Sequence, residues 1–247
     1  MAGHSKWANI KHRKGAQDAK RGKIFTRIIK EITVAVKESG PDPESNPRLR
    51  LAISNGKGNN MPKDTIDRAI KKAAGDDAAN YFEVTFEGYA PNGVAVFVEC
   101  MTDNNNRTVS DVRATYTKHG GSLGTNGSLE FIFSRKGVFV IAPNDQLDED
   151  EFTLELIDAG AEDVETNEGY FHITCDMKDF GSIQKKLEEL GVEAETAELQ
   201  RIPTTYAELD NDAFVKVMKM IDALEDVDDV QKVFHNMEIN DEQMSLL

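Results

Sequence analysis

The chain has few of the residues that stabilise small secreted proteins, since its 247 residues include only two cysteines. Cys100 and Cys175 each stand at the end of an apolar run, and two cysteines cannot build a disulfide framework. We expect both to be buried, reduced thiols, which fits a cytoplasmic protein. No apolar run reaches the roughly 18 residues of a transmembrane helix, and the basic N-terminus lacks the apolar core of a secretory signal.

Sets of residues with the spacing of catalytic or metal sites are also missing. The five histidines are scattered, and neither cysteine has a partner nearby in sequence. The acidic run 148–151 is typical of a solvated helix start, and Asp103 to Arg107 is better explained by helix capping than by a catalytic loop. We therefore expect no enzyme, no metal and no cofactor.

A glycine-rich segment has Gly121, Gly124 and Gly127 at intervals of three residues. A dinucleotide-binding loop follows a strand and begins a helix, so that helix N–H groups meet the phosphates. This segment instead follows a helical pattern and precedes a strand pattern. We expect a tight loop whose glycines need positive φ.

The net charge of −15 hides a strong asymmetry along the chain. Residues 1–75 contain 17 Lys and Arg but only 7 Asp and Glu, a net charge of +10. The remaining residues contain 12 basic and 37 acidic side chains, a net charge of −25. This asymmetry suggests that the basic part binds a polyanion, while the acidic part limits non-specific binding to nucleic acid.

Residues 20–37 have the pattern of an amphipathic helix. At about 100° per residue, an apolar stripe falls on one face and a row of cations on the opposite face, with Arg21 near the apolar edge. Only Glu31 and Glu38 interrupt the cations. The stripe contains Phe25, Ile28, Ile29, Ile32 and Val36, and the cations are Lys20, Lys23, Arg27, Lys30 and Lys37.

Residues 1–19 lack a clean apolar period and read as a flexible or loosely docked basic arm. Trp7, the only tryptophan, lies among the cations of this arm. It either stacks on an unpaired base or anchors the arm on the helices that follow. The cation row likewise either binds phosphates, is merely solvated, or pairs with the acidic part of the same chain.

The period of the apolar residues predicts a helical region followed by mixed structure. Asn46 before Pro47 is typical of a helix N-cap with a first-position proline, and Gly75 of a helix end. Near residue 80 the period changes from about 3.6 to about 2 residues, which indicates strands. We expect three helices in 20–75, and then the order strand, strand, helix, strand, the last strand being Ser128 to Phe133.

Residues 137–200 follow the order strand, helix, strand, strand, helix, strand, which is that of a ferredoxin-like fold. A helix and a strand after Pro203 would complete the preceding set, and the tail from Asn240 is expected to fray. The predicted fold class is α+β, an N-terminal helical bundle followed by two ferredoxin-like α/β domains, one inserted into the other. The expected domains are 1–79, 80–136 plus 203–240, and the inserted 137–202.

Several motifs carry a resemblance to a known family. The opening MAGHSKWANIKHRKGAQDAKRGKIFTRIIKEI resembles that of the YebC/PmpR family, and the similarity continues through NNMPKDTIDRAIKKA, FEGYAPNGVAVFVECMTDNNNRTVSDVRATYTKHGGSLGTNGS and LEDVDDVQKVFHN. The resemblance implies a helical domain, two α/β domains and no enzymatic activity. It also implies either a DNA-binding transcriptional regulator or, as for the mitochondrial translational activator, a protein that acts on the ribosome.

The sequence therefore predicts a non-enzymatic, nucleic-acid-binding regulator of gene expression. The alternative is a translation factor that grips ribosomal RNA with its basic arm and relieves stalled translation. Protein partners would meet the acidic domains, and no membrane is involved. An active site between the α/β domains and a pure protein-interaction module are the competing hypotheses. The expected nucleic-acid contacts, from the charge pattern and the family motifs together, are Lys6, Trp7, Lys11, His12, Arg13, Lys14, Lys20, Arg21, Lys23, Arg27 and Lys30.

Overall fold

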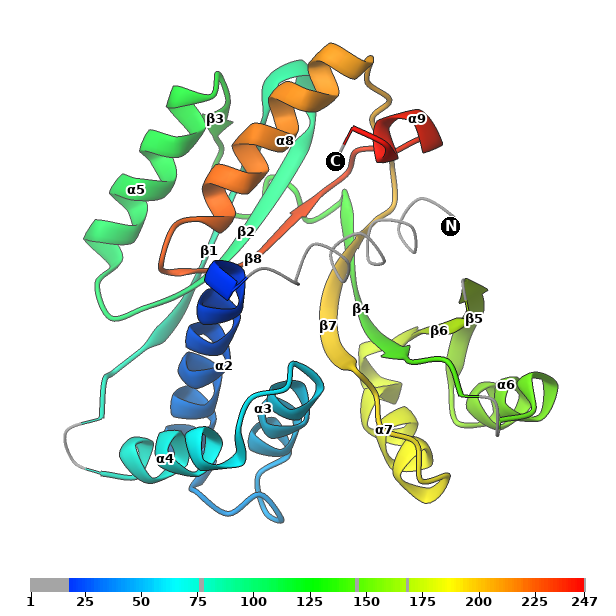
Figure 1. The fold of residues 1–247 in the computed structure, drawn as a ribbon. Helices are drawn as coiled ribbons and strands as arrows, with labels where there is room; N and C mark the ends of the chain where they lie inside the picture. Colours follow the sequence, from blue (N-terminus) through cyan, green and yellow to red (C-terminus); the bar gives the residue numbers. More distant parts are fainter. Residues whose placement is uncertain (1–17, 76–77, 145–146, 168, 247) are drawn as a thin grey trace. The chain divides into compact units, whose positions relative to one another are not determined.

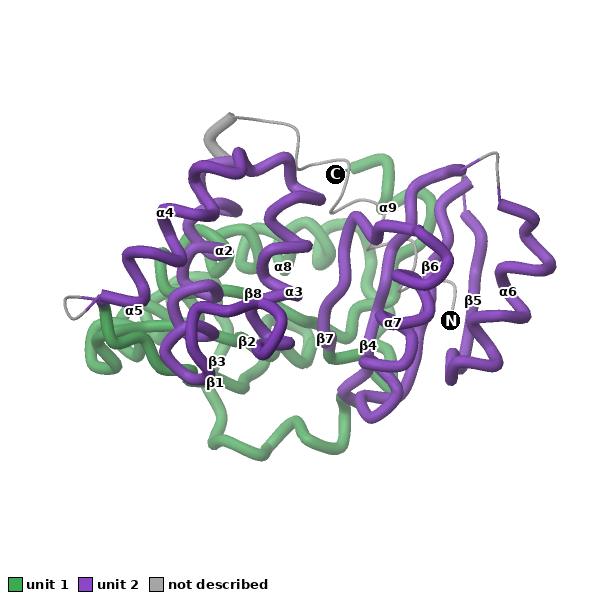
Figure 2. The backbone as a smooth tube through the Cα atoms, turned by 90° about the horizontal axis from the view of Figure 1, so that it is seen from below, with its two compact units in different colours: residues 1–16, 79–134, 201–247 green, residues 17–78, 135–200 purple. Residues whose placement is uncertain are grey.

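The structure, a computed structural model, describes residues 18–75, 78–144, 147–167 and 169–246, with side chains from Arg21 onward. It is an α+β protein in which a helical region is followed by two antiparallel four-stranded sheets (Figure 1), as the sequence predicted. The chain forms two compact units, one of 79–134 and 201–247 and the other of 17–78 and 135–200 (Figure 2). The division into domains at 1–79, 80–136 plus 203–240 and 137–202 stays a prediction.

Three helices form the first part of the described chain: α2 (Asp18–Ser39), α3 (Pro47–Gly58) and α4 (Lys63–Ala73). The predicted N-cap is confirmed, because the Asn46 side chain accepts a hydrogen bond of 3.0 Å from the Leu49 backbone N–H. The amide of Asn46 also donates to the Ala35 carbonyl at 2.7 Å and so ties α3 to α2. The buried core between the helices includes Ile28, Ile32, Val36, Leu49, Ala52, Met61, Ile66 and Ala69.

The first sheet has the strand order β3-β1-β2-β8. Its strands are β1 (Phe82–Tyr89), β2 (Ala95–Thr102), β3 (Ser122–Leu123) and β8 (Val230–His235), and a short 3₁₀ turn, η1 (Pro91–Gly93), joins β1 to β2. Helices α5 (Asn105–Lys118) and α8 (Asn211–Glu225) supply Tyr116 and Phe214 to the core that they share with alternate residues of β2. The Tyr116 hydroxyl donates a hydrogen bond of 2.9 Å to the Val96 carbonyl within this core.

The second sheet has the strand order β5-β6-β4-β7, with helices α6 and α7 packed on it. The chain order β4, α6, β5, β6, α7, β7 is the predicted ferredoxin-like order. The bounds are β4 (Phe133–Ile141), α6 (Glu149–Asp158), β5 (Ala161–Asn167), β6 (Tyr170–Asp176), η2 (Met177–Asp179), α7 (Phe180–Glu189) and β7 (Thr196–Pro203). Phe139, Phe152 and Ile173 are buried between the helices and the sheet.

The predicted strand from Ser128 to Phe133 is wrong, because residues 128–132 form turns and β4 begins only at Phe133. The cause is the carboxylate of Glu87 on β1, which is only 4% exposed. It accepts hydrogen bonds from the backbone N–H groups of Gly127 at 2.7 Å and Leu129 at 2.6 Å. A backbone that donates to a side chain forty residues earlier cannot use those N–H groups in a strand ladder.

The tail also differs from its prediction, because it is packed and ends in the short helix α9 (Asp241–Met244). Asn240 and Gln243 form a capping box, in which each side chain accepts from the other's backbone N–H. The Gln243 amide also donates to the Leu209 carbonyl at 2.7 Å, and Ile239 is buried. The low apolar content of the tail did not predict this packing, because polar side chains hold the tail in place.

Candidate nucleic-acid interface

Helix α2 carries the predicted combination of a buried stripe and exposed cations. Ile28, Ile32 and Val36 are buried in the core of the helical region. The two carboxylates that interrupt the cations are both bound by Arg48 of α3, at 3.1 Å for Glu31 and 3.0 Å for Glu38. Arg48 thus offsets part of the negative charge of Glu31 and Glu38, and the described side chains of α2 remain mainly positive.

The described cations of α2 differ in their exposure. Arg21 and Lys23 are exposed, and Arg27 is half-buried. Lys30 is only 7% exposed, so its predicted place on the open cationic face is wrong. The reason is that Thr33, Val34 and Ala35 are buried as well, so this part of α2 is enclosed on more than its apolar face. A regular helical period cannot reveal such enclosure.

The remaining predicted contacts lie outside the side chains that the structure describes. Lys20 belongs to α2, but its side chain lies outside the described part of the structure. Six residues of the arm lie outside the described residues altogether: Lys6, Trp7, Lys11, His12, Arg13 and Lys14. The structure therefore places Arg21, Lys23 and Arg27 on the first turns of α2, with Arg21 on a different side of the helix from Lys23 and Arg27.

Helix α4 adds a group of exposed cations that the sequence analysis did not select. Lys63, Arg68, Lys71 and Lys72 are all exposed, and α4 packs directly against α2. The signal was present in the charge count of 1–75. It was overlooked because Asp64 and Asp67 alternate with these cations, and because Lys71 and Lys72 also suit the negative end of the helix dipole.

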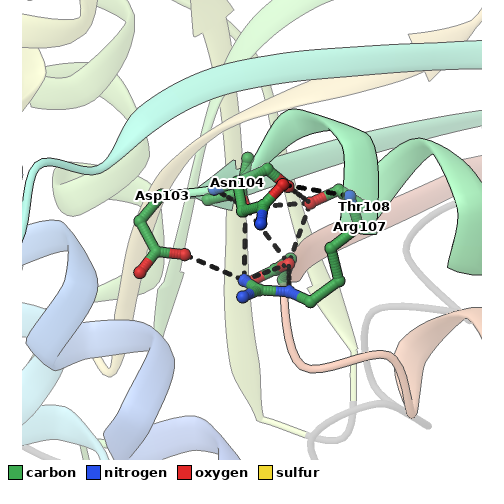
Figure 3. A network of polar contacts seen from close by, with 6 residues as sticks. Asp103, Asn104, Arg107 and Thr108 are labelled. Carbon is green, nitrogen blue, oxygen red and sulfur yellow. Dashed lines mark hydrogen bonds and ion pairs between the residues drawn. The ribbon is translucent and has the colours of Figure 1, made fainter.

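The polar segment after β2 is a capping network rather than an open cluster of acids (Figure 3). Asn104 caps α5 by accepting from the Arg107 backbone N–H at 3.2 Å, as predicted. The buried carboxylate of Asp229 accepts from Arg107 at 2.8 Å, from Thr108 at 2.8 Å and from Thr102 at 3.1 Å. Hydrogen bonds to Asp229 and Asp103 raise the pKa of Arg107, so its guanidinium stays charged.

The glycine-rich segment is shaped by close packing more than by backbone conformation. Only Gly127 of the three has positive φ, at 88°, so the prediction for Gly121 and Gly124 is wrong. A Cβ on Gly121 would lie 2.7 Å from the Tyr89 carbonyl oxygen, and one on Gly124 would lie 2.9 Å from the Ser128 hydroxyl. These glycines allow β3 and the following turn to approach β1.

The two cysteines are buried, as expected from the sequence. Burial raises the pKa of Cys175 to about 11, so its thiol stays protonated at neutral pH. In the described ranges, no cluster of three or more His, Cys, Asp or Glu has the arrangement of a metal site. None of the helices in the described part is long and apolar enough to cross a membrane.

Comparison with known proteins covers nearly the whole chain. The family model described as the TACO1/YebC protein N-terminal domain matches residues 5–76, and the model of the TACO1/YebC second and third domain matches residues 81–237. A "probable transcriptional regulatory protein" of Amoebophilus asiaticus is 59% identical over 244 residues, which is 98% of this chain and all of the relative. One of Idiomarina loihiensis is 51% identical over all of this chain and 99% of its own length.

A solved structure has the same fold. The crystal structure of a conserved hypothetical protein from Aquifex aeolicus superposes with a TM-score of 0.81 at 45% sequence identity. The match covers 91% of this chain and 93% of the other. The helical region and the two sheets are therefore a fold that an experimentally determined structure also has.

Proposed function

The chain belongs to the TACO1/YebC family, as its opening motif indicated, and on that premise we propose that it is a non-enzymatic regulator of gene expression that binds duplex DNA through its basic N-terminal part. Relatives that match over their full length are named probable transcriptional regulatory proteins. The arm and the first turns of α2 supply the contacts, and α4, which packs against α2, carries further exposed cations.

The observation that carries this proposal is the pairing of Arg48 with both Glu31 and Glu38 of α2. A solvated surface helix gains stability from Glu and Lys pairs along its own length. Here Arg48 of the neighbouring helix α3 binds Glu31 and Glu38, while Arg21 and Lys23 are exposed. Such a cationic surface is suited to successive phosphates, whose neutralisation releases counterions.

Backbone recognition is the mode that this surface supports. The sequence contains no motif that reads base edges, and exposed Lys and Arg side chains attract phosphates whatever the base sequence. The acidic remainder of the chain, with its net charge of −25, opposes non-specific coating of DNA. If about five cations contact phosphates, log K should fall with log salt at a slope of about −4 to −5.

Fluorescence anisotropy with a labelled DNA duplex at several salt concentrations tests the proposal. The double variant Arg21→Glu/Lys23→Glu should bind about tenfold or more weakly and make the slope less steep by about 2. The matched control Lys178→Glu/Lys185→Glu makes the same charge change at exposed positions of the acidic region. Equal affinity of the two variants, or a duplex affinity that salt does not change, would refute the proposal.

A sucrose gradient of DNase-treated lysate separates this proposal from the ribosomal alternative. The phosphates of ribosomal RNA carry the same charge as those of DNA, so anisotropy alone does not decide between them. If the full-length protein travels with ribosomal particles while a variant without residues 1–30 stays at the top, the arm grips the ribosome and regulation acts on translation. If both stay at the top while the duplex is bound, DNA is the target.

A further inference from the structure

The outer face of α6 exposes two large aliphatic side chains. Leu154 is 64% exposed and Ile157 is 51% exposed, whereas Phe152 and Leu156 on the other side of the helix are buried against the sheet. Leu154 and Ile157 are three residues apart and so are neighbours on one helix face. α6 lies alongside β5, the edge strand of its sheet (Figure 2). A single exposed leucine needs no explanation, but an adjacent pair forms a small apolar patch.

Acidic side chains surround this patch. Asp150 and Glu151 lie one turn before Leu154, and Asp158 lies one turn after it, all exposed. α6 contains no Lys or Arg of its own, and within the described residues its one ion pair is between Glu155 and Lys186 of α7, at 2.9 Å. The residues 135–200 that contain α6 have 5 basic and 18 acidic side chains. The patch is therefore apolar at its centre and negative at its rim.

Part of this charge has a structural explanation, and part does not. Acids in the first turn of a helix interact favourably with its positive end, and Asp148 caps α6 by accepting from the Glu151 N–H at 3.0 Å. Asp158 is different, because it stands in the last turn, where the helix dipole favours a cation. An exposed acid at this end, beside two exposed aliphatic side chains, costs stability unless something else binds there.

We propose that the outer face of α6, defined by Leu154, Ile157, Asp150, Glu151 and Asp158, is a docking surface for a cationic amphipathic helix of a protein partner. The partner's apolar stripe covers the two aliphatic side chains, as in helix recognition by an apolar surface. Its flanking Lys and Arg meet the acidic rim and the carbonyl end of α6, which gives charge complementarity. The inference does not rest on DNA binding by the N-terminal part.

Binding of designed peptides to the full-length protein tests this surface. The probe is a fluorescein-labelled 18-residue peptide with Leu along one helix face and Lys elsewhere, and the control replaces its Leu by Ser at equal charge. We expect the Leu-Lys peptide to bind about tenfold more tightly than the Ser-Lys peptide, because only the first removes apolar surface from water. Equal binding of the two peptides would show that only the negative charge of the protein attracts them, and it would overturn the proposal.

Substitutions on α6 test whether the peptide binds to this helix. Leu154→Ser/Ile157→Ser should weaken the Leu-Lys peptide about tenfold, while Phe131→Ser, which removes a 75% exposed side chain of the other unit, should leave it unchanged. Asp150→Asn/Asp158→Asn should weaken it mainly at low salt. Circular dichroism confirms the fold of each variant, and the Leu154→Ser/Ile157→Ser variant should keep the DNA affinity of the unchanged chain.

Two outcomes would overturn the assignment. Peptide binding that Phe131→Ser weakens as much as Leu154→Ser/Ile157→Ser would show that α6 is not the site. Sedimentation velocity that reveals a dimer, dissolved by Leu154→Ser/Ile157→Ser, would assign the face to a second copy of the chain. A monomer whose peptide affinity depends on Leu154 and Ile157 supports the docking surface.

Discussion

Asn55 of α3 forms a reciprocal pair of hydrogen bonds with the backbone of Ala197 on β7. The Asn55 side-chain amide donates to the Ala197 carbonyl at 3.0 Å, and its side-chain oxygen accepts from the Ala197 N–H at 3.2 Å. β7 ends its sheet, so Asn55 supplies the hydrogen bonds that a neighbouring strand would have supplied. A Cβ on Gly58 would collide with the Glu195 carbonyl. The backbone of α3 therefore lies very close to Glu195, the residue before β7.

Replacing Asn55 by Ala should therefore weaken the attachment of α3 to β7. The change leaves the Ala197 N–H and carbonyl without their partner, at an expected cost of about 1–3 kcal/mol. For a chain of this length, the melting temperature should fall by about 2–4 °C for each kcal/mol. Hydrogen exchange at the Ala197 amide should accelerate with it. Asn55→Asp keeps the acceptor but loses the donor, so an exchange rate for Asn55→Asp equal to that of Asn55→Ala would contradict this account.

Glu87→Gln should destabilise the turn before β4. The buried carboxylate receives two backbone N–H groups, and a glutamine side chain offers one oxygen and turns an NH₂ group toward the second donor. We expect a loss of about 2–3 kcal/mol in urea unfolding, because a backbone N–H is left buried and unpaired.

The matched control for this change is Glu83→Gln, which removes the same charge from an exposed position of the same strand. It should change stability by no more than about 0.5 kcal/mol. A similar loss in both variants would mean that charge, and not the pairing with Gly127 and Leu129, explains the effect.

The pairing of Asn55 with Ala197 and that of Glu87 with the turn before β4 show which kind of structure could not be predicted from the sequence. Local patterns predicted other parts of the fold. The stripe of Ile28, Ile32 and Val36 repeats at the helical period, and the Asn46 cap lies three residues from its donor, so local patterns were sufficient. The turn after Gly127 depends on Glu87, and the attachment of α3 depends on Asn55 and a backbone 142 residues away. Such polar pairings between distant residues leave no periodic signal.

The candidate site shows the same limit. The charge count located the basic region, and the structure places Arg21 and Lys23 on its exposed surface. Lys30 was assigned to that surface because it lies opposite the apolar stripe, but it is buried. Its environment is set by the packing around the middle of α2, which the helix period alone does not describe.

Charge reversal should therefore act differently along α2. Lys30→Glu places a carboxylate in a buried position built around an ammonium and should cost about 3 kcal/mol or more. Arg21→Glu/Lys23→Glu changes exposed positions and should alter stability by no more than about 0.5 kcal/mol while weakening DNA binding. Thermal unfolding and duplex anisotropy of the same samples measure both effects. Wild-type stability of Lys30→Glu would show that this side chain is not enclosed.

Alkaline pH should destabilise the protein through two buried acids, the Cys175 thiol and the Tyr116 phenol. Burial raises the pKa of Cys175 from 9.0 to about 11, and burial also raises the pKa of Tyr116 above its ordinary value of 10.0. At a pH between the ordinary pKa and the raised pKa of either group, the unfolded chain has lost a proton that the folded chain keeps. The unfolded state then binds fewer protons, so the free energy of unfolding falls as pH rises.

The contribution of Cys175 is fully present below pH 9.0 and is lost as pH rises toward about 11. It should amount to on the order of 2 kcal/mol over this range, since one pKa unit corresponds to about 1.4 kcal/mol. Urea unfolding at pH 8, 9, 10 and 11, to be done in a reducing buffer, measures the change. Cys175→Ala starts from lower stability because it leaves a cavity, but its stability should fall less steeply between pH 9 and 11. Parallel curves for the two proteins would show that the thiol does not titrate on unfolding.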